Sequence, residues 1–237
     1  MSRETFNLKQ AAEHVHLTEA DLKHAAQRGE LAASEHGGDW HFNHRDLDEW
    51  AQRQLLAANE KALRAQHSVM MDENRREHRE NWCIADLFNP ASVDLALAAK
   101  AKAGVIRDMT DLAVESGLVY DIDGLYAELV AREQAAPTAI GREIAILHPR
   151  YHDPYFFEET FIAYGRSLRP IFFGAPDGEV TRHFFMVCST DHEIHLHILA
   201  RLAVLAHGTD LLEKLDAAES VDDVLRAVRE AEANFIR

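Results

Sequence analysis

A histidine stands at the end of a short apolar run in the stretch Ala145-Ile-Leu-His-Pro-Arg150. An imidazole held at the end of a strand can act as a nucleophile or as a metal ligand, because its neutral form carries a lone pair near pH 7. Pro149 restricts the backbone directly after it. His148 could equally be a half-buried histidine that hydrogen-bonds a carbonyl, since histidine is intermediate in its tendency to be buried. The choice depends on which other side chains the fold brings to His148.

Further histidines in the second half of the chain make a metal site one alternative. Imidazole and carboxylate groups suit zinc or nickel, and the candidate ligands are His148, His152, Asp153, His192, His195 and His197. His195 and His197 stand two residues apart, and on a helix this spacing points their side chains in different directions. We therefore expect no metal. Cys83 and Cys188 match no metal or redox spacing, and we expect both to be reduced and buried.

The composition bounds the class of protein. The chain has 237 residues, of which 47% are hydrophobic, and a formal net charge of -15. This length suits a small module followed by a medium one. Charges interrupt the apolar runs well before the ~18 residues of a membrane helix, and the N-terminus lacks the apolar core of a signal peptide, so we expect a cytosolic protein without membrane insertion. The negative charge argues against broad nonspecific attraction to nucleic acid or anionic lipid.

The first residues have the pattern of two short helices joined by a tight turn. Apolar residues between Leu8 and Val15 fall at helical spacing. Thr18 suits the N-cap of a second helix, and Gly29 suits the position just after its end. This pattern is typical of a helix-turn-helix.

A wing is predicted to follow. Gly37-Gly38 separates two β-compatible runs as in a hairpin, and a further helix starts at about His44. Residues 4–55 resemble the excisionase/MerR-type DNA-binding domain, and the resemblance rests on TFNLKQAAEHVHLTEADLKHAAQRGEL and GGDWHFNHRDLDEW. A small winged helix-turn-helix over residues 1–55 is therefore expected.

The resemblance implies that double-stranded DNA is a partner of this module. The second helix would face the major groove, and the hairpin would lie by a phosphate or the minor groove; the residues concerned are Thr18, Lys23, His24, Arg28 and His41. Glu19 and Asp21 lie on the same helix, whereas phosphate contacts usually come from Arg and Lys. The module could therefore equally serve protein contact or dimerisation.

Residues 56–82 are expected to form a helical linker. The sequence from Asp46 to about Glu80 is rich in helix formers and has no Gly or Pro. Its apolar residues could form the seam of a homodimer, although the pattern is too short to predict a coiled coil: Trp50, Leu55, Leu56 and Leu63.

Residues 83–237 contain sequence patterns typical of strands and of helices in alternation. A half-buried strand is expected in SVDLALAA, and helices are expected in KAKAGVIRDMTDLAVESG, closed by Gly117, and in DIDGLYAELVAREQ, with Asp121 as its N-cap. Three further strands, in EIAILHP, ETFIAYGR and RHFFMVCS, precede three C-terminal helices. Strands between helices on both sides predict an α/β sandwich, a mixed sheet flanked by helices.

This second region resembles the enzyme IIA domain of the phosphotransferase system, of the fructose/mannitol and nitrogen-regulatory type. Four stretches carry the resemblance, in order and at the family's spacing: LVARE, IGREIAILHPR, PIFFGAPDGE and HLHILARLAVL. FGAPDG is the most specific of them. The fold class implied for the whole chain is α/β, an IIA-like sandwich preceded by a small winged helix-turn-helix.

The resemblance implies a phosphotransferase that needs no cofactor. His148 matches the histidine that accepts a phosphoryl group from the histidine phosphocarrier protein and passes it on to a IIB-type or regulatory target protein. Imidazole suits this task, because a phosphoramidate keeps a high transfer potential. Arg132 matches an arginine that pairs with phosphate oxygens, and His195 matches a second active-site histidine that orients the phosphoryl group. Arg150 could also reach the phosphate.

Two positions depart from the family pattern. Gly141-Arg-Glu143 stands where the family usually has Gly-Xaa-Gly, and Leu147 stands where proline usually precedes the histidine. We expect the missing glycine to reduce backbone freedom near the site, or to bring the charge of Glu143 close enough to oppose a phosphate.

We still expect a working phosphoacceptor, joined to the N-terminal module as a regulator. One alternative is a plain phosphocarrier whose N-terminal module serves only for docking. Another is an unphosphorylated IIA-like sensor in a DNA-binding transcription regulator.

Overall fold

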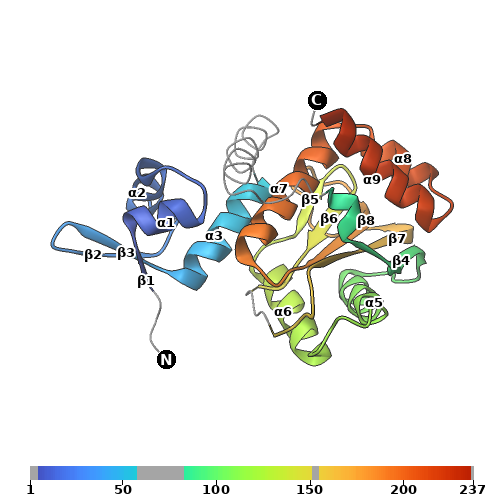
Figure 1. The fold of residues 1–237 in the computed structure, drawn as a ribbon, viewed down its shortest axis with the longest axis horizontal. Helices are drawn as coiled ribbons and strands as arrows, with labels where there is room; N and C mark the ends of the chain where they lie inside the picture. The colour runs from blue at the N-terminus through green and yellow to red at the C-terminus, as the bar shows by residue number, and fades with distance from the viewer. Residues whose placement is uncertain (1–4, 58–82, 151–154, 236–237) are drawn as a thin grey trace. The chain divides into compact units, whose positions relative to one another are not determined.

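The computed structural model describes residues 5–57, 83–150 and 155–235 (Figure 1). The chain divides into two compact units, Met1–Arg79 and Glu80–Arg237. Within the described residues, no helix has both the length and the apolar character needed to cross a membrane.

The first unit combines short helices with a three-stranded antiparallel sheet. Its elements are β1 (Thr5–Asn7), α1 (Leu8–His14), α2 (Glu19–Gln27), β2 (Ala33–His36), β3 (Asp39–Asn43) and α3 (His44–Ala57). The strand order is β1-β3-β2. The sequence did not predict β1, because three residues are too few for a periodic signal.

The predicted cap and end of the second helix and the predicted hairpin turn are confirmed. The Thr18 hydroxyl accepts a hydrogen bond from the amide of Asp21 and so caps α2. Gly29 follows this helix with φ +72°. Gly37 and Gly38 have φ +64° and +95° between His36 and Asp39, which pair across the hairpin. Two residues with positive φ are what a tight two-residue hairpin turn requires.

The predicted homodimer seam stays a prediction. Trp50, Leu55 and Leu56 are already buried within a single chain. Leu63 and almost all of the predicted linker, residues 58–82, lie outside the described residues.

The second unit contains one mixed five-stranded sheet. Its elements are η1 (Ile84–Leu87), β4 (Phe88–Leu97), α5 (Lys102–Val114), α6 (Ile122–Ala135), β5 (Ala139–Gly141), β6 (Ile144–Leu147), β7 (Phe161–Ile171), β8 (Thr181–Cys188), α7 (His192–Gly208), α8 (Leu211–Ala217) and α9 (Val221–Phe235). The strand order is β4-β7-β8-β6-β5. β4 runs parallel to β7 and β6 parallel to β8, while the β7–β8 and β5–β6 pairs are antiparallel.

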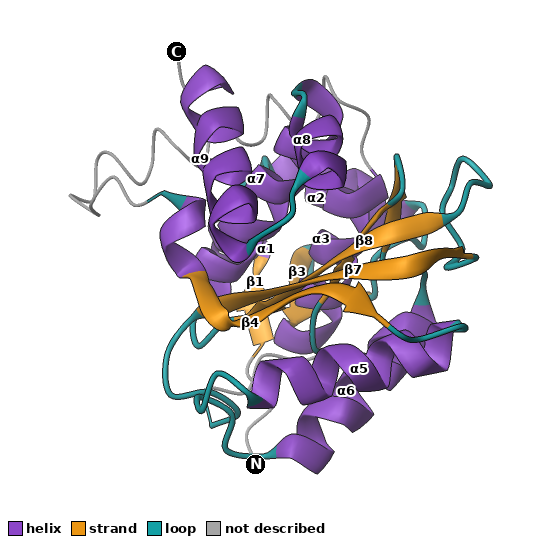
Figure 2. Ribbon diagram, turned by 90° about the vertical axis from the view of Figure 1, so that its right-hand side faces the viewer, coloured by secondary structure: helices purple, strands orange, loops and turns teal. Residues whose placement is uncertain are grey.

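Helices cover both faces of this sheet. Figure 2 shows α5 and α6 on one face and α7, α8 and α9 on the other. Successive side chains of β8 point to opposite faces of the sheet, as in any strand. Phe184, Met186 and Cys188 point to the same face and pack in the core beneath α5 and α6. The predicted α/β sandwich is confirmed.

Both cysteines are free thiols, but only one of them is fully buried. Cys188 lies in the core, whereas Cys83 is partly exposed, contrary to the prediction. Cys83 directly precedes η1, the first element of the second unit, and its thiol donates a hydrogen bond to the carboxylate of Glu232. Burial and this hydrogen bond raise the pKa of Cys83 to about 11. The thiol is therefore protonated at neutral pH and a poor nucleophile.

Candidate functional site

Three elements of the second unit converge where β6 ends. His148 directly follows β6, and β8, which is parallel to β6, ends at the same edge of the sheet. α7 starts just after β8, with Asp191 capping it through the amide of Ile194. This start places His195 in the first turn of α7. Arg132 lies in the last turn of α6.

The side chains of Arg132 and His148 are in direct contact. The Nε–H group of Arg132 donates to Nε2 of His148 at 2.8 Å, and Nδ1 of His148 lies 2.9 Å from the carbonyl oxygen of Ile146. A carbonyl oxygen can only accept, so Nδ1 carries the proton of the neutral ring. Nε2 consequently holds the lone pair and faces the guanidinium.

The ring of His195 packs against the ring of His148. Their centroids are 5.3 Å apart with an interplanar angle of 63°. The three residues predicted to form one site therefore lie together: Arg132, His148 and His195. All three are at most 1% exposed. A reacting partner can reach Nε2 only after neighbouring residues move.

A second set of contacts fixes the end of α6, and the sequence did not predict it. Nη1 of Arg132 donates to the carbonyl oxygen of Ala136 at 2.8 Å. The neighbouring Glu133 is buried, accepts from the amide and the hydroxyl of Thr138, and pairs with Nζ of Lys102 at 2.6 Å. Lys102 thus compensates the carboxylate beside the site. No sequence spacing links Lys102 with Glu133, because they lie 31 residues apart on different helices.

The remaining residues of the predicted site lie as follows. Arg150 is half-buried two residues after His148, and its contribution to phosphate binding stays a prediction. His152 and Asp153 lie outside the described residues. Among the residues that are described, His148, His192, His195 and His197 do not supply three ligand atoms close enough for one metal ion.

The expected effect of Glu143 on the site is wrong. Arg142 and Glu143 form the turn between β5 and β6, whereas His148 follows the other end of β6. A strand rises about 3.3 Å per residue, so five residues separate Glu143 from His148 by roughly 16 Å. The charge of Glu143 and the backbone of its turn are therefore remote from Nε2. Leu147 is buried in the core beneath α5 and α6.

The predicted DNA-contacting residues lie on α2 and the hairpin of the first unit. Lys23 and His24 are exposed on α2, and His41 is half-buried on β3. The Thr18 hydroxyl also donates to the Asp21 carboxylate at 2.6 Å, and the guanidinium of Arg28 forms two hydrogen bonds with Glu30. The Thr18 hydroxyl and the Arg28 guanidinium thus already have hydrogen-bond partners within the first unit.

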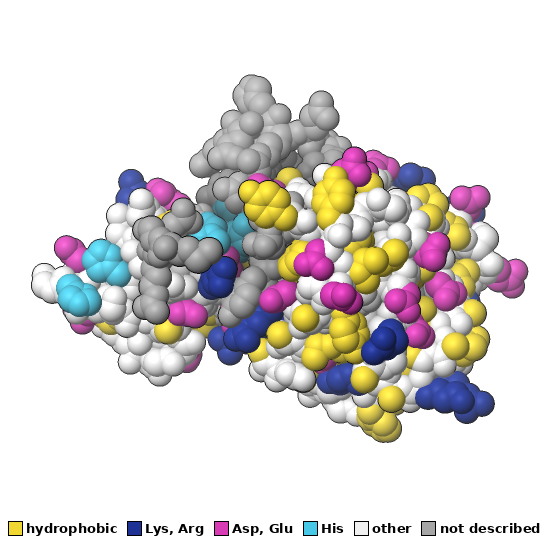
Figure 3. Space-filling view, turned by 90° about the horizontal axis from the view of Figure 1, so that it is seen from below, with side chains coloured by type: hydrophobic (Ala, Val, Ile, Leu, Met, Phe, Trp, Pro, Cys, Tyr) yellow, Lys and Arg dark blue, Asp and Glu magenta, His cyan; other side chains and the backbone are white. Residues whose placement is uncertain are grey.

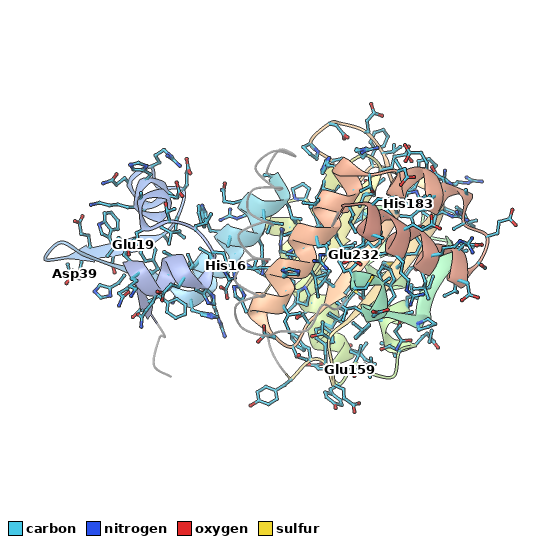
Figure 4. The ribbon with its side chains drawn as sticks, turned by 45° about the horizontal axis from the view of Figure 1, so that its top comes forward. His16, Glu19, Asp39, Glu159, His183 and Glu232 are labelled. Atoms are coloured by element: carbon cyan, nitrogen blue, oxygen red, sulfur yellow. The ribbon has the colours of Figure 1, made fainter. Side chains whose placement is uncertain are left out.

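Charge on the first unit is mixed. Residues 5–57 contain five Lys and Arg against nine Asp and Glu, a net charge of -4 with histidine neutral. Glu19 lies at the start of α2 and Asp39 at the hairpin (Figure 4). On the face of this unit that Figure 3 shows, acidic and histidine side chains are interspersed with the basic ones. Any contact with DNA phosphates would therefore have to be local.

The chain is similar to known proteins over both units. A family model described as Phosphoenolpyruvate-dependent sugar phosphotransferase system, EIIA 2, matches residues 86–231, and a helix-turn-helix domain model matches residues 5–55. The fructose-specific EIIA component of the phosphotransferase system of Haloferax volcanii is 36% identical over 134 residues, which are 54% of this chain and 85% of that protein.

Solved structures share the fold of the second unit. Nitrogen regulatory protein IIA-Ntr from Neisseria meningitidis aligns with a TM-score of 0.55 and 22% identity over 61% of this chain and 98% of its own. The complex of mannitol enzyme IIA with phosphorylated enzyme IIB from Escherichia coli aligns with a TM-score of 0.52 and 20% identity over 60% of this chain and 96% of the matched chain. With a helix-turn-helix domain ahead of this sandwich, the chain belongs to the EIIA 2 family of the phosphoenolpyruvate-dependent sugar phosphotransferase system.

Proposed function

We propose that this chain is a cytosolic protein whose second unit accepts a phosphoryl group on Nε2 of His148. The donor would be the histidine phosphocarrier protein, and the acceptor a IIB-type or regulatory protein. The orientation of the ring carries the proposal: the Ile146 carbonyl keeps the proton on Nδ1, and the Arg132 guanidinium faces the lone pair on Nε2.

The transfer needs one nucleophile and a few well-placed donors. Nε2 attacks phosphorus, and the new N–P bond forms while the bond to the donor's nitrogen breaks, with the electron pair leaving on the donor. Arg132 redirects its N–H groups from Nε2 to the phosphate oxygens and offsets their charge. His195 and Arg150 are proposed to orient the phosphoryl group. The proton stays on Nδ1 throughout, and the Ile146 carbonyl oxygen accepts its hydrogen bond.

Phosphorylation by purified components tests this role. Incubation with phosphoenolpyruvate, enzyme I and the phosphocarrier protein should put one acid-labile phosphate on the wild-type chain and none on H148A. The matched control is H207Q, because His207 lies on the same helix as His195 but about 18 Å further along it. Failure to label the wild type, or equal labelling of H148A, would contradict the proposal.

A regulatory output through DNA is the second half of the proposal. The match of residues 5–55 to a helix-turn-helix domain supports it. A phosphoryl group on His148 adds negative charge to the second unit, and added charge is a common way to change a contact. Binding to genomic DNA fragments should weaken as salt rises, since phosphate contacts release counterions. K23A and H24A should weaken it further, whereas K100A, which removes an exposed lysine of the second unit, should not.

One observation favours the sensor alternative. His148 is 0% exposed, so the described conformation does not present its nucleophile to a partner. An unphosphorylated chain that binds DNA in the same way with and without the phosphocarrier components would support the sensor. A change in DNA affinity on phosphorylation, absent in H148A, would support the regulator, and phosphorylation without any DNA binding would support the plain carrier.

A further inference from the structure

A second cluster of titratable side chains lies in the first unit, apart from the proposed phosphoacceptor. His14 ends α1, His44 begins α3, and Asp48 follows one turn later on α3. Nε2 of His14 lies 2.7 Å from Oδ1 of Asp48, and Nδ1 of His44 lies 3.2 Å from Oδ2 of Asp48. The two imidazoles thus face the two oxygens of one carboxylate.

We propose that His14, His44 and Asp48 form a divalent metal site, with Zn²⁺ as the ion that it fits best. Their ligand atoms all lie within 4.8 Å of one another. Ligands around a tetrahedral zinc ion are about 3.4 Å apart, since each bond is about 2.0–2.2 Å long. Shifts of side-chain torsions therefore suffice to bring the three atoms onto one ion. Two imidazoles and a carboxylate are a donor set that zinc commonly takes, with a fourth position left for water.

The surroundings of the cluster suit a bound cation. The side chain of Asp48 is only 7% exposed, and a buried carboxylate is stable only when it is paired or coordinates a metal. The ring of Phe6 packs against both imidazoles, with centroids 4.8 Å from His14 and 5.4 Å from His44. An apolar wall of this kind limits the access of water and holds the ligand rings in place.

The sequence positions provide the geometry. His44 and Asp48 are four residues apart on one helix, so their side chains lie on the same face. His14 comes from the other helix, which makes the site a bridge between the last turn of α1 and the first turns of α3. Each neutral ring must turn its lone pair toward the ion and carry its proton on its other nitrogen. Binding would stabilise the folded first unit, since the separated ligands of an unfolded chain bind far more weakly.

Metal titration of the full-length protein tests the site. After removal of metal by a chelator, calorimetry with Zn²⁺ should show one site per chain in the first unit, and Co²⁺ should give the visible absorption of a tetrahedral complex. D48N and H44Q should each weaken Zn²⁺ binding by at least about tenfold, the loss seen even when only supporting contacts of a metal site are removed. Zn²⁺ should also raise the melting temperature of the wild type.

Three controls keep the test decisive. H36Q removes an exposed histidine of the same unit, and it should bind as the wild type does. H148Q/H195Q removes the rings of the proposed phosphoacceptor site, and it should keep the first-unit zinc, so this result does not depend on phosphoryl transfer. If D48N fails to fold by circular dichroism, H44Q and H14Q carry the test. Absence of wild-type binding, or binding that H44Q and D48N leave unchanged, would show a hydrogen-bonded cluster only and overturn the proposal.

Discussion

The Nε–H group of Arg132 donates to Nε2 of His148 at 2.8 Å, the nitrogen that would form the bond to phosphorus. The guanidinium is therefore in position before a phosphoryl group arrives. A hydrogen bond from Nη1 to the Ala136 carbonyl also holds it at the end of α6. An arginine kept in place in this way needs little reorganisation to stabilise the transferred charge.

Replacing Arg132 by lysine should slow phosphorylation of His148. Lysine keeps the positive charge but loses the planar fork that can bind two phosphate oxygens at once. Loss of one preorganised donor in a closed site slows a reaction by about 10²–10³-fold. Rapid-quench phosphorylation by the phosphocarrier protein would measure this rate. R107K, at an exposed arginine of α5, should react as the wild type does, and an unchanged rate in R132K would show that Arg132 is structural.

Replacing Glu143 by glycine should stabilise the second unit. Glu143 has φ +59°, in the left-handed region that side chains with a Cβ disfavour. The carboxylate makes no hydrogen bond or ion pair within the described residues, so glycine loses no contact there. Relief of the strain is worth about 1 kcal/mol, less the larger conformational entropy of glycine in the unfolded chain. Urea unfolding of wild type and E143G would measure the gain.

The neighbouring position provides a matched contrast. Arg142 also has a positive φ, +50°, but its guanidinium donates to the carbonyl oxygens of Ala206 and His207 at the end of α7. R142G should therefore lose as much as it gains and fail to stabilise the protein. Equal stabilisation by R142G and E143G would mean that these hydrogen bonds contribute nothing measurable.

The sequence predicted most of the secondary structure, because local signals determined it. Thr18 and Asp121 cap the helices that they were expected to cap, and Gly37-Gly38 makes the predicted hairpin turn. The convergence of Arg132, His148 and His195 followed from the family resemblance, since no local pattern joins a helix end, a strand end and a helix start.

What the sequence did not predict rests on contacts between distant residues. The FGAPDG stretch is the most specific part of the resemblance, yet it does not lie at the proposed site. Its Asp177 carboxylate accepts a hydrogen bond from the amide of Arg142, which precedes β6, whereas His148 follows the other end of this strand. Hydrogen bonds from the amide of Glu179 and, to a smaller extent, from the amide of Arg142 lower the pKa of Asp177. The His14–His44–Asp48 cluster depends in the same way on how α1 packs beside α3, which no periodicity reveals.

A buried ion pair between α7 and α9 should be a major contributor to stability. Nη1 of Arg201 lies 2.5 Å from Oε1 of Glu232, and both side chains are at most 4% exposed. Glu232 also accepts the amide of Ile84 and so ties η1 to α9. Removing one partner of such a pair leaves an uncompensated buried charge, so E232L should cost about 3–5 kcal/mol.

A double variant separates the contribution of the ion pair to stability from that of the packing of its side chains. R201M/E232L removes both charges and fills similar volume, so it should be more stable than E232L alone even though the Ile84 amide loses its acceptor. Chemical denaturation of the four proteins in this cycle gives the coupling free energy. A double variant that is less stable than E232L would show that the positive charge of Arg201 is compensated by groups other than Glu232.

His183 should make the second unit acid-sensitive. It is fully buried on β8 (Figure 4). The Tyr164 hydroxyl lies 2.8 Å from its Nδ1, and Asp216 of α8 lies 3.3 Å from its Nε2. Burial lowers the pKa of His183 to about 4; Asp216 opposes this shift, while the nearby Arg182 and Arg166 add to it. The folded protein thus keeps this ring neutral at a pH where the unfolded chain, with a pKa near 6.5, already binds a proton.

The direction of the effect follows from this proton uptake. Above about pH 6.5 both states are neutral and His183 adds no pH dependence; between about pH 6.5 and 4 the unfolded state gains a proton first, so stability falls with pH by up to about 3 kcal/mol. H183N keeps an acceptor for Tyr164 but cannot titrate, so its unfolding free energy should fall less over this range. Y164F keeps the titrating ring and should retain the acid loss. Urea midpoints measured from pH 7 to 4 would decide, and parallel pH curves for wild type and H183N would place the acid sensitivity elsewhere in the chain.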